Sequence, residues 1–172
     1  MTDPPGVAGL HDPIISEQHY RATLGHFCSG VTIVTGAGTG AAGPAGLTCQ
    51  SFSSLSLDPP LVLVCPGKGS GSWPKVAASG GFCVNVLAED QEEVCRAFAA
   101  PGTDKFSGVG WTPGRFTGAP VIAGALAWIE CRLEAVHEGG DHHIAVGRVL
   151  EMQAREGRPL LFYRGGYGRF EI

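Results

Sequence analysis

Short apolar runs separated by glycine- and proline-rich turns dominate the pattern of this chain. Residues 31–35, 82–87 and 160–163 are rich in β-branched and aromatic side chains, which favour strands. The turns between such runs are typical of hairpins, and regular alternation of strands with helices is not seen. The pattern therefore predicts a mainly β protein with antiparallel connections.

Residues 127–135 give a clear strand signal, because apolar and polar side chains alternate along them. One face would carry Ala127, Ile129, Cys131, Leu133 and Ala135, and the other Glu130, Arg132 and Glu134. A strand with this period of two is buried on one face and solvated on the other. The turn 138–141 follows, and residues 143–152 are predicted to form the returning strand of a hairpin.

The stretch 46–65 joins a polar half to an apolar half. Asp58-Pro59-Pro60 separates the halves, and because no helix can cross this breaker we expect two strands joined by a fixed corner. The first strand carries small polar side chains at Thr48, Cys49, Gln50, Ser51, Ser53, Ser54 and Ser56. Hydroxyl and main-chain groups packed this densely beside a core suit a planar polar ligand better than a single nucleophile.

Three helices are predicted around the strands. Residues 16–27 begin with a serine that can cap a helix and carry apolar side chains at helical spacing. A second helix is expected from Ser72 to Gly80-Gly81, and a third from a cap at Asp90 to Pro101. Six or seven strands with three helices favour an antiparallel barrel with peripheral helices.

Length and composition narrow the function classes. The 172 residues suit one domain, assigned to 14–172, after a proline- and glycine-rich tail at 1–13 that we expect to be flexible. The net charge of −4 indicates neither nucleic acid nor an anionic membrane as partner. No apolar run approaches the ~20 residues that span a bilayer. The cysteines form no C-x-x-C pair, so buried free thiols in a reducing cytoplasm are expected.

Several motifs admit more than one interpretation. Residues 38–43 match G-x-G-x-x-G, but Pro44 follows where a dinucleotide motif needs a helix, so a hairpin loop is favoured. The turn 66–74 carries Lys68 and leads into a predicted helix, which can cradle a phosphate but is common in ordinary turns. The chain has no G-x-S-x-G elbow, and no cysteine has a clear basic or resolving neighbour.

A metal site on the predicted hairpin is a more serious alternative to a ligand-binding barrel than a catalytic serine is. Its candidate ligands are His137, Asp141, His142 and His143, which are side-chain types that bind zinc or iron. Solvated polar residues at a hairpin tip would give the same pattern.

Residues from about Tyr20 to Phe170 resemble the flavin reductase family, the small reductase components of two-component flavin monooxygenases. The matching pieces follow the family's order: 27–35, 46–61 (GLTCQSFSSLSLDPPL), 104–106 (DKF) and 140–142 (GDH). The resemblance implies an antiparallel split β-barrel of the FMN-binding, Greek-key-like type, usually a homodimer. The most similar members serve hydroxylases of aromatic-ring and steroid catabolism or of natural-product pathways.

The resemblance also implies which residues form the site. The isoalloxazine and ribityl phosphate would contact Thr48, Cys49, Gln50, Ser51, Ser53 and Ser54. The phosphate and any adenylate end would be covered by Cys65, Pro66, Lys68, Ser70, Ser72 and Trp73. Lys105 and Phe106 would close over the flavin, His142 would be the catalytic residue near the nicotinamide, and Tyr167 and Arg169 would meet either NADH or the dimer partner.

The activity implied is hydride transfer from NADH to FAD or FMN, after which the reduced flavin leaves for a separate monooxygenase in the cytoplasm. The cofactors carry this chemistry and the protein supplies alignment, so the absence of an obvious acid, base or nucleophile is expected. A non-enzymatic flavin- or haem-binding carrier or sensor is the leading alternative. An oxidase of the pyridoxamine-phosphate type is the next, although its phosphate pocket would need more basic residues than this chain supplies.

Overall fold

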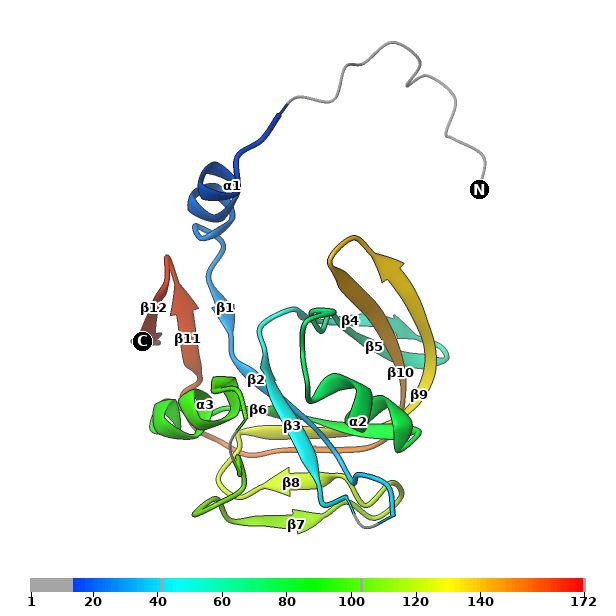
Figure 1. The fold of residues 1–172 in the computed structure, drawn as a ribbon. Helices are drawn as coiled ribbons and strands as arrows, with labels where there is room; N and C mark the ends of the chain where they lie inside the picture. Colours follow the sequence, from blue (N-terminus) through cyan, green and yellow to red (C-terminus); the bar gives the residue numbers. More distant parts are fainter. Residues whose placement is uncertain (1–13, 41, 103, 172) are drawn as a thin grey trace.

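The computed structural model describes residues 14–40, 42–102 and 104–171. Seven antiparallel strands form the main sheet (Figure 1), in the order β3 (Ala45–Cys49), β2 (Thr32–Gly36), β6 (Gly81–Val86), β9 (Ala127–Gly139), β10 (His142–Ala154), β5 (Pro60–Val64) and β4 (Phe52–Leu57). The pairs β2–β3, β4–β5 and β9–β10 are hairpins. The mainly β, antiparallel fold with three helices is thereby confirmed.

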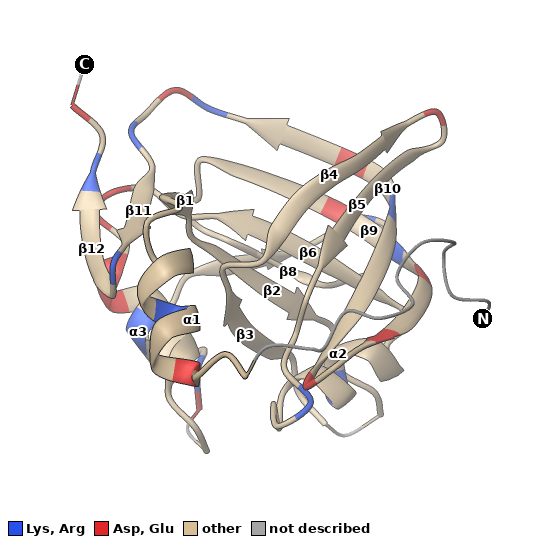
Figure 2. Ribbon diagram, turned by 90° about the horizontal axis from the view of Figure 1, so that it is seen from above, with Lys and Arg blue, Asp and Glu red and all other residues tan. Residues whose placement is uncertain are grey.

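The two edge strands of this sheet are neighbours in the sequence. Only Gln50 and Ser51 separate the end of β3 from the start of β4, so the sheet must curl until its opposite edges approach each other (Figure 2). At this corner the Phe52 N–H donates to the Gln50 carbonyl at 2.9 Å and the Cys65 N–H donates to the Ser51 carbonyl at 3.0 Å. Figure 2 also shows acidic and basic residues scattered over the molecule rather than gathered by sign.

This corner corrects the single polar strand predicted before Asp58. The stretch forms two strands that pair with different partners, β3 with β2 and β4 with β5. Thr48 and Ser53 therefore lie on opposite edges of one sheet, although only a few residues separate them in the chain.

Two smaller sheets complete the strands. One contains β1 (Ser29–Gly30), β11 (Leu160–Tyr163) and β12 (Gly166–Arg169), and the other is the hairpin of β7 (Trp111–Pro113) and β8 (Pro120–Ile122). The sequence predicted β11 correctly. It placed β7 in a loop and β12 in a terminal segment, because strands this short and rich in glycine or proline give no periodic pattern.

The helices are α1 (Glu17–Leu24), α2 (Trp73–Ala78) and α3 (Glu92–Ala99). Ser16 caps α1, since its side chain accepts a hydrogen bond from the His19 N–H at 3.2 Å. Ser72 precedes α2 as predicted, although its side chain makes no capping bond. The predicted cap of α3 is wrong, since this helix follows Gln91 instead of Asp90. Gln91 is buried and its side chain accepts from the Ala88 N–H, which fixes the turn before the helix.

Helices α2 and α3 both pack on β3, and each covers part of the core. Trp73 and Val76 of α2 join one buried cluster, while Cys95 and Phe98 of α3 join a second. A side chain at Gly46 would meet the Phe98 ring at 2.5 Å, so only glycine allows α3 to approach β3 this closely. No helix within the described ranges is long and apolar enough to cross a membrane.

Glu130 departs from the predicted pattern of β9. It was expected on a solvated face with Arg132 and Glu134, but it is fully buried, whereas Arg132 is exposed. The loop between β7 and β8 covers this part of the strand. One carboxylate oxygen of Glu130 accepts from the N–H groups of Phe116 and Thr117 and from the Thr117 hydroxyl. Loop coverage at one position cannot be seen in an alternating pattern.

Glu130 should therefore contribute to stability. We expect Glu130→Ala to lower the free energy of unfolding by about 2–4 kcal/mol, because the donors of the 116–117 segment lose their acceptor. Glu130→Gln should lose less, since its amide oxygen can still accept. Urea unfolding measures both, with Glu156→Ala as the exposed control. Equal stability of Glu130→Ala and the parent would contradict the assignment.

Candidate functional site

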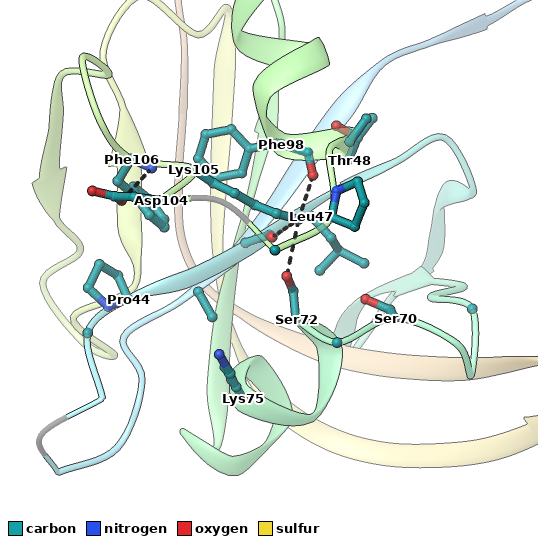
Figure 3. A pocket seen from close by; sticks show the side chains of 18 of the residues that line it. Pro44, Leu47, Thr48, Ser70, Ser72, Lys75, Phe98, Asp104, Lys105 and Phe106 are labelled. Carbon is teal, nitrogen blue, oxygen red and sulfur yellow. Dashed lines mark hydrogen bonds between the residues drawn. The ribbon is translucent and has the colours of Figure 1, made fainter.

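A cavity of about 900 Å³ opens between β3, the turn before α2 and the end of α3 (Figure 3). Its walls consist of described residues in the segments 42–48, 67–75 and 98–106. Cavities that hold small molecules and cofactors have volumes of roughly 300–1,000 Å³. The space therefore suits a ligand of nucleotide size.

Glycines expose main chain to this cavity. A side chain added at Gly43, Gly69 or Gly71 would meet no other protein atom within 4 Å, so all three border open space. Unhindered main-chain groups of this kind let a polar ligand approach the backbone closely.

Lys105 joins three walls of the cavity. Its ammonium donates to the Phe98 carbonyl at 2.8 Å, to the Ser72 hydroxyl at 3.2 Å and to the Gly46 carbonyl at 3.3 Å (Figure 3). An ammonium has three protons, so these bonds use its full donor capacity. The pKa of Lys105 is lowered, first by partial burial and then by the positive charge of Lys75.

Lys75 is a cavity residue that the sequence did not single out. It lies on α2 and lines the same space as Lys105 (Figure 3). Its only sequence signal is its place just after the glycine-rich turn, whereas Lys68, the predicted lysine, lies inside that turn. Lys68 forms an ion pair with Glu138 and is not a lining residue.

Six of the predicted site residues line the cavity: Thr48, Gln50, Ser70, Ser72, Lys105 and Phe106. Most of their polar groups already hold the walls together. The Thr48 hydroxyl donates to the Cys95 carbonyl of α3 at 2.8 Å, the Gln50 amide donates to the Ser29 hydroxyl at 2.8 Å, and the Ser70 hydroxyl accepts from the Trp73 N–H at 3.2 Å.

His142 lies at the tip of the β9–β10 hairpin, next to the lining residue Gly67 but not itself part of the cavity lining. It bridges with Gly67, and an added side chain at Gly67 would lie 3.6 Å from the His142 Nε2 atom. The turn and hairpin are also joined by main-chain bonds from Lys68 to Asp141 and from His143 to Pro66, both of 2.9 Å. The His142 Nδ1 atom lies 2.8 Å from the Asp141 carboxylate, and this bond lowers the pKa of Asp141.

The remaining predicted residues lie elsewhere. Cys49, Pro66 and Trp73 are buried, Cys65 is half-buried, and burial raises the pKa of the Cys49 thiol to about 11. Ser51, Ser53 and Ser54 are exposed at the corner and along β4. These placements leave their roles toward a flavin as predictions.

Tyr167 and Arg169 lie on β12, away from the cavity lining. The Tyr167 hydroxyl lies 3.2 Å from the Cys95 sulfur, and the Arg96 guanidinium stands over its ring at 4.8 Å. The hydrogen bond to Cys95 is the first cause that raises the pKa of Tyr167 to about 12. Tyr167 therefore packs on α3 of its own chain.

The structure also places the cysteines and the suspected metal ligands. Cys49, Cys83, Cys95 and Cys131 are buried and free, as expected, while Cys28 is exposed. In the described part of the chain, no three histidine, cysteine or acidic side chains gather as a metal site would require. The Nδ1 atom of His143, one of the suspected ligands, instead lies 3.7 Å from the Oε1 atom of Glu138.

Comparison with known proteins identifies the class of this fold and site. The sequence model for the flavin reductase like domain matches residues 24–171. The chain is 49% identical, over 99% of its length and 87% of the relative's, to the reductase subunit HsaB of a flavin-dependent monooxygenase from Rhodococcus jostii. This chain belongs to the flavin reductase like family.

Solved structures agree. Component B of a nitrilotriacetate monooxygenase from Mycobacterium thermoresistibile superposes with a TM-score of 0.84 at 48% identity, covering 90% of this chain and 87% of the other. The NADH:FAD oxidoreductase SgcE6 of Streptomyces globisporus, in complex with NAD and FAD fragments, gives 0.84 at 38% identity, covering 93% and 98%.

Gly71→Leu tests whether the cavity holds the flavin. The variant should fold normally, because the new side chain meets open space, and should bind flavin about tenfold more weakly or worse by filling the ligand's place. Equilibrium titration with oxidised FAD gives the affinity. Ser53→Leu is the matched variant on exposed β4. Loss of binding in Ser53→Leu alone would place the flavin on β4 and contradict the cavity assignment.

Proposed function

We propose that this chain is an NADH-dependent flavin reductase that supplies reduced FAD or FMN to a separate monooxygenase. Family membership over residues 24–171 is the observation that carries the proposal. Relatives named for the same role include the HsaB reductase subunit and the NADH:FAD oxidoreductase SgcE6. The cavity beside β3 supports the proposal, because its volume of about 900 Å³ lies in the range of roughly 300–1,000 Å³ that cofactor sites have.

The residues around the cavity suit a flavin nucleotide. Exposed main chain at the glycines offers hydrogen-bonding groups, Phe106 offers an aromatic face, and Lys75 offers a positive charge. The bound flavin and nicotinamide supply the hydride acceptor and donor. The chain's own contribution is to hold the two ligands face to face and to exclude water from between them.

His142 is the proposed residue on the nicotinamide side. The Asp141 carboxylate accepts a hydrogen bond from the His142 Nδ1 atom, which orients the ring, and the Nε2 atom faces Gly67 of the cavity lining. From this place beside the wall residue Gly67, the imidazole can orient a second ligand next to the flavin.

The proposal is tested by NADH oxidation in air with FAD, FMN or riboflavin added in turn, followed by the loss of NADH absorbance. Turnover should depend on added flavin, and the rates should reveal the preferred flavin and, with NADPH in place of NADH, the preferred nicotinamide. Folded protein that turns over no flavin with either nicotinamide would refute the proposed function.

His142→Ala tests the nicotinamide side. The KM for NADH should rise about three- to tenfold, as expected for the loss of one hydrogen-bonding contact, while flavin affinity stays nearly unchanged. His137→Ala is the matched control, because it removes an exposed histidine from the same hairpin. An unchanged KM for NADH in His142→Ala would remove this residue from the site.

A homodimer is proposed from the exposed apolar side chains of the N-terminal region. Helix α1 contains no buried residue, and Ile14, Tyr20, Leu24 and Phe27 are more than half exposed. Apolar side chains gathered in this way on one segment mark a protein interface. A second copy of this chain is the proposed partner, and the oxygenase would bind only transiently, in the cytoplasm.

Charges placed at the end of α1 and in the turn after it should separate the proposed dimer. The double variant Leu24→Glu, Phe27→Glu should sediment as a single chain of 17.8 kDa, and the parent at twice that mass. Leu57→Glu is the control, since Leu57 is exposed at the distant β4–β5 turn. A parent that sediments as a monomer, or separation by Leu57→Glu alone, would show that this interface is wrong.

A further inference from the structure

Two lysines line the cavity, and they differ in their burial and in their hydrogen bonding. Lys105 is half-buried, and all three of its ammonium protons are donated to wall residues. Lys75 is exposed and lines the same cavity. Unlike Lys68, which pairs with Glu138, Lys75 makes no ion pair or hydrogen bond with another residue of the described ranges.

The charges around Lys75 favour an anion. Among the described lining residues, Asp104 is the only carboxylate, against the two ammonium groups of Lys75 and Lys105. The Asp104 carboxylate accepts from the Phe106 N–H at 3.2 Å, so it is engaged within its own turn. Two like charges that share a concave space repel each other, and a bound anion between them would remove that cost.

The neighbouring backbone leaves room for a group of phosphate size. Gly43, Gly69 and Gly71 line the same cavity as Lys75, and all three border open space. A phosphate could therefore approach both the ammonium and the exposed main-chain groups without displacing a side chain.

We propose that Lys75 binds a phosphate of the nucleotide that occupies the cavity, while Lys105 holds the cavity walls together. The inference rests on the proposed function, because the flavin nucleotides FAD and FMN and the nicotinamide dinucleotide are the phosphate-bearing ligands of that reaction. Lys75 then selects for phosphorylated ligands, and riboflavin, which carries no phosphate, should be insensitive to it.

Equilibrium binding tests this assignment without turnover. Lys75→Met should weaken binding of FAD about fivefold at low ionic strength and leave riboflavin unchanged, as expected for one partly exposed charge pair. Lys75→Arg should restore most of the affinity. Added salt should weaken FAD binding to the parent more than to Lys75→Met. Arg132→Met is the charge-matched control, because Arg132 is exposed on β9 and does not line the cavity.

The choice of ligand identifies the source of the phosphate. Weaker binding of FAD and FMN assigns Lys75 to the flavin phosphate, and weaker binding of NADH alone assigns it to the nicotinamide dinucleotide; both results support the proposal. Equal loss for riboflavin and FAD, or no loss for any ligand, would overturn it. Failure of the parent to turn over NADH would refute the proposed function separately, since the binding titrations contain one ligand at a time.

Lys105→Met separates the roles of the two lysines. This change removes the links to Gly46, Ser72 and Phe98, so it should lower thermal stability and weaken riboflavin and FAD alike. If Lys105→Met weakened the binding of only the phosphorylated ligands and left stability unchanged, the phosphate would be assigned to Lys105. That result would contradict the proposed division of roles between the two lysines.

Discussion

The two-residue link between β3 and β4 constrains the whole fold. These strands are the opposite edges of a seven-stranded sheet, yet only Gln50 and Ser51 join them. The sheet has to curl to satisfy this connection, and a curled sheet has an interior that can be filled by large side chains such as Phe82. Both helices pack on β3: α2 joins the buried cluster that contains Leu47, while α3 lies against Gly46 and Thr48. The cavity lies where these two helices and the strand meet.

The cavity is held open by contacts between its walls. Lys105 ties β3 to the end of α3 and to the turn before α2, and Thr48 adds a bond from β3 to α3. Glycines on the facing surfaces keep the space unfilled. Rigid walls with exposed main chain suit a ligand that must bind in a defined orientation and then leave, since little protein has to reorder at each cycle. A reductase that passes its reduced flavin to another protein needs this behaviour.

The sequence predicted the class of fold and the family correctly, together with part of the cavity lining. Apolar runs and alternation located β2, β6, β9 and β11, because burial sets those patterns locally. The division of the stretch 46–57 into two edge strands depends on pairing with distant partners, which a single sequence does not reveal. Glu130 was predicted to face solvent, because the alternating pattern does not reveal that the loop near Thr117 covers it. Lys75 was overlooked for the same reason, since only the packing of α2 on β3 brings it to the cavity.

The most direct test of the account is the fate of the flavin after reduction. NADH and excess FAD are incubated with the protein under anaerobic conditions, and the mixture is passed through a membrane that retains the chain. We predict many reduced flavins per chain in the filtrate, with one NADH oxidised for each. Reduced flavin that stays on the protein, at no more than one per chain, would contradict a reductase that supplies a partner and would indicate a carrier or sensor.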